Sequence, residues 1–119
     1  MATEPLTTDV RQQSGVAIID LKGEIDGFSD EELANAYARA EQSNPPVVVL
    51  NFKDVDYINS TGIALIVGLL AKARQARRRL LVYGLSDHYQ EIFSITRLSD
   101  FMSVYPDEES ALSAVAEPV

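Results

Sequence analysis

The 119-residue sequence contains no cysteine and no tryptophan, and it has a single histidine. Without cysteine, disulfide bonds and thiolate metal sites are excluded, which fits a reducing compartment. Basic residues are also few: 10 lysines and arginines stand against 18 aspartates and glutamates, giving a formal net charge of −8. Binding to nucleic acid or to an anionic membrane requires clustered cations that displace counterions, so we expect neither partner.

Long apolar runs are missing as well. The longest uncharged apolar segment, Thr61 to Ala71, is too short to span a bilayer, and the N-terminal MATEPLTTDV lacks the basic and apolar blocks of a secretory signal. The sequence therefore predicts a cytoplasmic protein without a membrane anchor. At this length one core is the default, so we expect a single domain over residues 1–119, with flexible tails at 1–5 and 116–119.

Five segments have the composition of β-strands, and two of these are apolar on both faces, as in the centre of a covered sheet. The segments are Leu6–Gln12, Val16–Gly23, Val47–Phe52, Leu80–Gly84 and Phe101–Tyr105. The first two, joined by Ser14 and Gly15, predict a hairpin, and the later order strand, helix, strand predicts a parallel crossover. We expect an α/β sandwich with a mixed, mostly parallel sheet of about five strands and about four helices.

The predicted helices begin near Ser29, Ser60, Ser86 and Asp107. At the first helix, Ser29 and Glu32 have the spacing of a capping box, while Phe28 and Leu33 have that of a hydrophobic staple. The buried stripe of this helix is predicted to be Leu33, Ala36, Tyr37 and Ala40.

The segment YINSTGIALIVG, residues 57–68, places Ser60 before a glycine and an apolar helix that should extend to about Arg78. Three interpretations are open for Ser60: a helix N-cap, a nucleophile, or a residue that accepts a phosphate at the positive end of the helix dipole. A nucleophile needs a base within hydrogen-bond reach, and the only histidine, His88, follows another loop without a recognisable motif. We expect His88 at the surface, in the first turn of the third helix. NSTGI also differs from the G-x-S-x-G elbow, so we expect no enzyme. No spacing of histidine, aspartate and glutamate indicates a metal site, and no P-loop or Rossmann glycine pattern is present, so we expect neither a metal nor a cofactor.

The same helix carries a ridge of small residues at Ala64, Gly68 and Ala71, beside a predicted buried stripe. That stripe comprises Ile63, Ile66, Val67, Leu70 and Ala73. The ridge is either part of the core or a flat docking surface, and the sequence leaves both open. A phosphate on Ser60 would add about −1.5 to −2 charges next to such a surface and so repel a docked partner.

Three blocks of the chain, LKGEIDGFSDEEL, VVVLNFKDVDYINSTGIALIVGLLAKARQARRRLLVYGLSD and DEESALSAV, carry a resemblance to a known family. Together they resemble a STAS domain of the bacterial anti-sigma factor antagonist type, over nearly the whole chain. The resemblance implies partner switching, in which a cognate anti-sigma factor kinase phosphorylates Ser60. The unphosphorylated antagonist captures that kinase and frees the sigma factor, and a phosphatase resets the cycle.

The resemblance also implies a kinase-facing surface that includes the segment Gly23–Asp26. The residues expected to contact the partner are Asp26, Asn59, Thr61, Gly62, Ala64 and Gly68. The chain itself would be a monomer or a weak dimer.

Two departures from the family pattern concern asparagines, since aspartate usually stands where this chain has Asn59, just before the serine, and Asn51, at the end of the central strand. Asparagine keeps the hydrogen-bonding shape but cannot assist a magnesium ion or a proton transfer as a carboxylate does. Alternatives to the switch are therefore a constitutive binder, a stressosome-type scaffold, an antagonist for an unusual kinase, or a STAS domain that senses a nucleotide or lipid.

Overall fold

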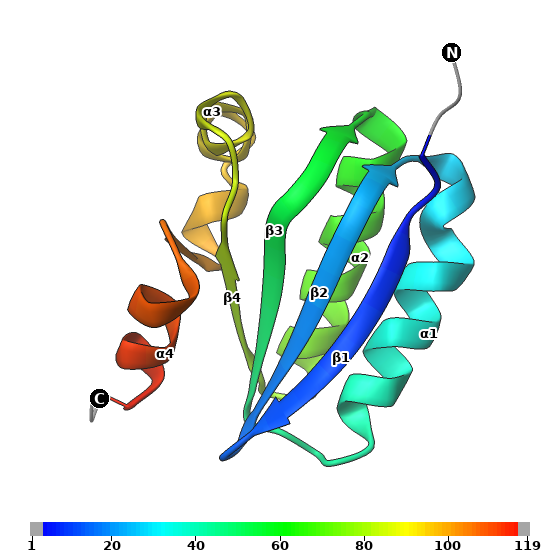
Figure 1. Ribbon diagram of the computed structural model, residues 1–119. Helices are drawn as coiled ribbons and strands as arrows, with labels where there is room; N and C mark the ends of the chain where they lie inside the picture. The colour runs from blue at the N-terminus through cyan, green and yellow to red at the C-terminus, as the bar shows by residue number, and fades with distance from the viewer. Residues whose placement is uncertain (1–3, 117–119) are drawn as a thin grey trace.

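The computed structural model describes residues 4–116 and contains one sheet with helices on both sides (Figure 1). The strands are β1 (Thr7–Gln13), β2 (Val16–Ile25), β3 (Val47–Ile58), β4 (Arg79–Tyr83) and β5 (Ser103–Tyr105). The α-helices are α1 (Asp30–Glu41), α2 (Ser60–Gln75), α3 (Asp87–Ile95) and α4 (Glu108–Ala116). Two short 3-10 helices are η1 (Gly27–Ser29) and η2 (Leu98–Asp100).

The strands of the sheet lie side by side in chain order, β1-β2-β3-β4-β5. β1 and β2 form an antiparallel hairpin, while β2, β3, β4 and β5 pair in parallel. Ser14 and Gly15 close the hairpin with positive φ angles of 29° and 82°, as the tight turn between two twisted strands requires. The predicted mixed, mostly parallel sheet of five strands with four α-helices in one compact domain is confirmed.

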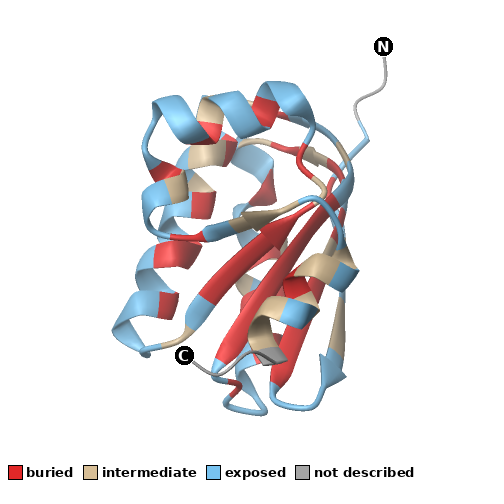
Figure 2. Cartoon of the chain, turned by 90° about the vertical axis from the view of Figure 1, so that its left-hand side faces the viewer, coloured by how far each residue is buried: buried red, intermediate tan, exposed pale blue. Residues whose placement is uncertain are grey.

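Alternating side chains of the strands enter two separate cores. On one face, α1 and α2 pack through an apolar cluster that includes Ile19, Leu50 and Ile66, and α3 joins it with Phe93. On the other face, α4 packs through a smaller cluster that includes Ile18 and Ala111. The central strands are consequently buried, whereas the outer sides of the helices are exposed (Figure 2). The predicted stripe of α1 is confirmed: it consists of Leu33, Ala36, Tyr37 and Ala40.

Several predicted boundaries were wrong, and the largest error concerns β3. It was expected to end at Phe52 but continues to Ile58, because β2 extends beside it as a pairing partner after β4 has ended. Side chains in this outer half of β3 are mostly polar and exposed, so the apolar signal of a buried strand is absent there. Residues 1–3 and 117–119 of the predicted tails lie outside the described residues, whereas Glu4 and Pro5 pair with Glu24.

Candidate partner-binding site

The helix α2 begins directly after the end of β3, and Asn59 forms its N-cap. The side-chain oxygen of Asn59 accepts a hydrogen bond of 2.8 Å from the Gly62 amide, and its backbone is extended with φ −92°. Ser60 is therefore the first residue inside the helix rather than the cap, and its side chain is exposed. The interpretation of Ser60 as the helix N-cap was wrong by one residue, since Asn59 holds that position. The Ser60 hydroxyl does not take part in capping the helix.

Two backbone amides point outward from this first turn. The amides of Gly62 and Ile63 donate to the side chain and the carbonyl of Asn59, respectively. Those of Ser60 and Thr61 have no acceptor within residues 4–116. Free amides at the positive end of a helix dipole favour a negative group, so this turn can accept charge on or beside Ser60.

Gly62 joins the start of α2 to the end of β2. It is buried, and a Cβ atom at this position would overlap the carbonyl of Ile25. The same Ile25 carbonyl accepts a hydrogen bond of 3.2 Å from the Asn59 amide. The absence of a side chain at Gly62 therefore lets the start of α2 approach β2 closely. Within the segment 23–26, Ile25 lies against the helix start, whereas Gly23 packs against Glu4 and Pro5. Gly23 and Ile25 are buried residues of β2, so only part of this segment is available at the surface.

The small-residue ridge of α2 lies on the surface. Ala64, Gly68 and Ala71 are exposed, while the neighbouring face of the helix is buried against the sheet. Ala64 and Gly68 line a shallow groove between α2 and α1. Val67 was predicted to be buried but is 42 % exposed, because Leu69 takes a core position instead. Of the two open interpretations, the core is excluded for this ridge, and it is available as a docking surface.

The start of α1 differs most from the prediction. The turn η1 precedes it, and Asp26 caps this turn by accepting a hydrogen bond of 2.9 Å from the Phe28 amide. Ser29 makes no cap hydrogen bond to α1, and its side chain is turned inward toward Asp26 and Glu24. Phe28 is 98 % exposed, so the predicted staple with Leu33 does not exist. The spacing of Asp26 and Ser29, itself a capping pair, was the missed signal.

Asn51 lies on the opposite face of the sheet from α2. It shares the side of β3 that carries Val47 and Val49, which pack toward α4. Its side-chain amide donates a hydrogen bond of 2.7 Å to Asp20 on β2. The rest of β3 separates it from Ser60 by roughly 20 Å at the usual rise of a strand. The expectation that Asn51 stands at the end of the strand was wrong, and it cannot take part in chemistry at Ser60.

Around Asn51 lies a network of charged side chains that joins β1 and β2 to α4. Arg11 contacts Asp20 at 2.7 Å and Glu108 at 2.6 Å. Burial acts to raise the pKa of Asp20, but hydrogen bonds from Arg11 and Asn51 outweigh it, and the pKa lies below its ordinary value. Hydrogen bonds from Arg11 and Tyr83 lower the pKa of Glu108. Both carboxylates are therefore charged at neutral pH, and sequence patterns gave no indication of this network.

Other kinds of site find little support in the part of the chain that the structure describes. His88 lies exposed in the first turn of α3, as predicted, with its ring against Tyr89. No group of three or more histidine, aspartate or glutamate side chains within residues 4–116 is arranged to hold a metal ion. Among the described helices, none has both the length and the apolar character needed to cross a bilayer.

Comparison with known proteins gives the same architecture. The family model described as STAS domain matches residues 7–111. An anti-sigma-B factor antagonist of Staphylococcus aureus (strain NCTC 8325 / PS 47) is 33% identical over 86 residues, which cover 72% of this chain and 80% of that protein. A crystal structure of an anti-sigma factor antagonist from Mycobacterium paratuberculosis has a TM-score of 0.83 at 24% identity, covering 98% of this chain and 100% of the other.

A further solved structure is that of the Bacillus cell fate determinant SpoIIAA in the phosphorylated form. It has a TM-score of 0.70 at 21% identity and covers 92% of this chain and 99% of its own. At this identity the likeness concerns the fold. The match of the family model over most of the sequence is the decisive finding, and it agrees with the strand order and helix positions described above. The chain belongs to the STAS domain family.

Proposed function

We propose that this protein is an anti-sigma factor antagonist that acts by partner switching. In its unphosphorylated form it binds an anti-sigma factor kinase, phosphorylation of Ser60 releases it, and a phosphatase restores the binding form. The observation that carries the proposal is the exposed Ser60 hydroxyl at the first residue of α2, beside the exposed ridge of Ala64 and Gly68. Membership of the STAS family and the names of its relatives support the same function.

The geometry explains how a phosphate could act at this position. The free amides of Ser60 and Thr61 and the positive end of the helix dipole favour the added charge, so the fold should tolerate it. The surface beside the ridge would change from neutral to anionic. A partner that buries this surface would then have to desolvate a phosphate, and its affinity would fall.

Asn59 is compatible with this mechanism although the family pattern usually has an aspartate there. Its side-chain oxygen caps the helix as a carboxylate would, but it carries no charge. A phosphate on Ser60 is therefore not repelled by its neighbour. Because Asn59 is a weak ligand for Mg²⁺, we expect the kinase to supply the carboxylate ligands of the metal ion that accompanies ATP.

The proposal is tested by incubating the protein with the cognate anti-sigma factor kinase and ATP and mapping the phosphate by mass spectrometry. We expect modification of Ser60, none in Ser60→Ala, and normal modification in the matched control Ser94→Ala, which removes an exposed hydroxyl on α3. Ser60→Ala should bind the kinase like the wild type, and Ser60→Asp should bind more weakly. A phosphate found elsewhere, or a Ser60→Asp variant with wild-type affinity, would contradict the switch.

The competing function is a STAS domain that senses a nucleotide or lipid, and the free amides at the start of α2 are the observation that favours it. A ligand that binds only the folded chain raises its melting temperature in a saturable manner. A thermal-shift series with nucleotides and short-chain phospholipids separates the two: saturation at micromolar ligand supports sensing, and no shift supports the antagonist.

A further inference from the structure

Phe28 is a large apolar side chain that the fold leaves in water. It is 98 % exposed, whereas the other exposed large hydrophobic residues among those described range from 42 % to 71 %. These other residues are Tyr57, Val67, Ile95 and Phe101. Single exposed apolar residues are common on protein surfaces, so exposure alone assigns no role. A role for Phe28 is instead inferred from the hydrogen bonds of the loop that carries it and from the charges nearby.

The loop is held rigidly by hydrogen bonds on both sides of Phe28. The Phe28 amide donates to the Asp26 carboxylate at 2.9 Å, and the Asp26 amide donates to the Ser29 hydroxyl at 2.9 Å. The Ser29 hydroxyl in turn donates to the Glu24 carbonyl at 3.2 Å, and Ser29 is only 3 % exposed. The backbone of Phe28 is thus ordered before any partner arrives. Binding through a preorganised loop avoids the entropy loss of ordering it.

This loop lies against the turn that carries Ser60. A Cβ atom added to Gly27 would be 3.5 Å from the methyl group of Thr61, the residue after Ser60. A protein that covers the Ser60 hydroxyl therefore also reaches η1, the turn that carries Phe28.

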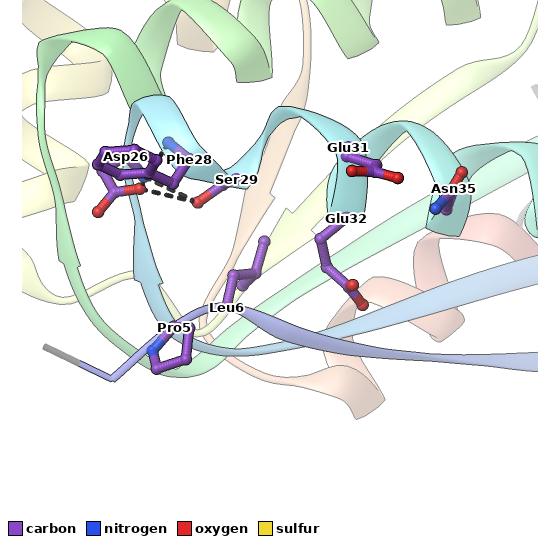
Figure 3. A pocket seen from close by; sticks show the side chains of 8 residues that line it. All are labelled: Pro5, Leu6, Asp26, Phe28, Ser29, Glu31, Glu32 and Asn35. Carbon is purple, nitrogen blue, oxygen red and sulfur yellow. Dashed lines mark hydrogen bonds between the residues drawn. The ribbon is translucent and has the colours of Figure 1, made fainter.

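The charges near Phe28 have one sign. Phe28 lines a pocket between the start of α1 and β1, together with Asp26, Glu31 and Glu32, and no lysine or arginine lines it (Figure 3). Figure 3 shows the Phe28 ring beside Asp26, and the carboxylates of Glu31 and Glu32 further along α1, on the other side of Ser29. An apolar side chain at the edge of an acidic pocket is complementary to an apolar pocket of a partner that has cations on one side.

We propose that Phe28 is the anchor by which the anti-sigma factor kinase recognises this protein. Its ring inserts into an apolar pocket of the kinase, and lysine or arginine side chains around that pocket face Asp26 and Glu31. This inference rests on the proposed function and adds the chemistry of the partner surface to it. Aromatic anchors in fully desolvated pockets carry a large share of the binding free energy of many interfaces.

The test measures the affinity of the purified cognate kinase for unphosphorylated variants by isothermal titration calorimetry. Phe28→Ala should weaken binding by at least about 30-fold, the loss expected for a hot-spot residue. Phe101→Ala is the matched control: it removes an exposed phenylalanine that contacts Arg74 near the other end of α2, and it should change affinity by less than about twofold. Glu31→Lys should weaken binding, and more strongly at low than at high salt.

Phosphorylation kinetics provide a second readout. Because the ring contacts the kinase away from the hydroxyl that reacts, Phe28→Ala should raise the KM for this protein as substrate and leave kcat unchanged. If Phe28→Ala binds within about twofold of the wild type, the anchor is refuted while the switch at Ser60 stands. If the wild-type chain itself fails to bind the kinase, the proposed function fails, and the anchor with it.

Discussion

The two faces of the sheet are closed by different means. The face under α1 and α2 is filled by a continuous apolar cluster. The opposite face has a small apolar cluster under α4, and beside it the hydrogen-bonded charges of Arg11, Asp20 and Glu108. The apolar face packs against α2, which carries Ser60, while the mixed face packs against the short helix α4. The larger apolar cluster thus lies beneath the surface that we propose a partner covers.

The two asparagines lie in these two regions and have separate roles. Asn59 replaces a carboxylate with a neutral cap at α2, next to Ser60. Asn51 is a hydrogen-bond donor to a carboxylate on the mixed face, where a second carboxylate would face Asp20. The same change of residue type therefore concerns the partner site in one case and the packing of α4 in the other.

The largest expected effect is on the free energy of unfolding when either of two adjacent isoleucines of β2, which point to opposite faces of the sheet, is replaced by alanine. Ile19 enters the cluster under α1 and α2 at 1 % exposure, and Ile18 enters the cluster under α4 at 0 % exposure. Ile19→Ala should lower the free energy of unfolding by about 4 kcal/mol, and Ile18→Ala by about 2 to 3 kcal/mol, because the short α4 can shift to fill part of the cavity. Urea unfolding at neutral pH measures both, and a larger loss for Ile18→Ala would contradict the comparison.

An intermediate effect is expected when Asn51 is changed to the aspartate of the family pattern. Asn51→Asp would bring two carboxylates together and raise the pKa of one, whereas the pKa of Asp20 in the wild type is lowered. The variant should lose about 2 kcal/mol at neutral pH.

The contribution of these carboxylates to stability changes with pH in opposite directions in the wild type and in Asn51→Asp. The lowered pKa of Asp20 stabilises the wild type above the unfolded value of about 4, and this contribution is lost as the pH falls. The raised pKa in Asn51→Asp means that stability is lost as the pH rises. The difference between the proteins should therefore shrink from pH 7 to pH 4 in urea unfolding. In the control Asp20→Asn/Asn51→Asp, one amide again faces one carboxylate, so most of the stability lost in Asn51→Asp at neutral pH should return. If stability does not return, repulsion between the two carboxylates is not the cause.

The smallest effect is expected at Asn59. Asn59→Ala removes the hydrogen bond to the Gly62 amide and should cost about 1 kcal/mol in the free energy of unfolding. Asn59→Asp keeps the cap and should leave stability within about 0.5 kcal/mol of the wild type, since carboxylates are favourable at helix N-termini. Thermal unfolding measures both. Equal losses in the two variants would show that Asn59 contributes by something other than its side-chain oxygen.

Much of the fold could be predicted from the sequence because its apolar residues follow the periods of strands and helices. The β-branched and aliphatic composition of Val16–Gly23, the apolar run Val47–Phe52 and the stripe of α1 each correspond to an element in the structure. The exposed start of α2 could be predicted as well, since a polar segment precedes an apolar helix there.

The remaining features depend on competition between neighbours or on distant contacts. Asn59 and Ser60 are both good caps, and Asn59 takes the position. Asp26 caps η1 before Ser29 can cap α1, which places Phe28 outside the core. The contact of Arg11 with Glu108 joins the first strand to the last helix and has no local pattern. The face of the sheet on which Asn51 lies could have been predicted, because side chains alternate along a strand and Val47, Val49 and Asn51 share one side.

The packing of Gly62 against Ile25 also bears on how long a signal could last. With no room for even a methyl group, the start of α2 has little freedom to adopt a second arrangement when charge is added. The state of a switch at this position would therefore be defined by the phosphate ester and not by a second conformation. The signal would then last until an enzyme hydrolyses that ester bond.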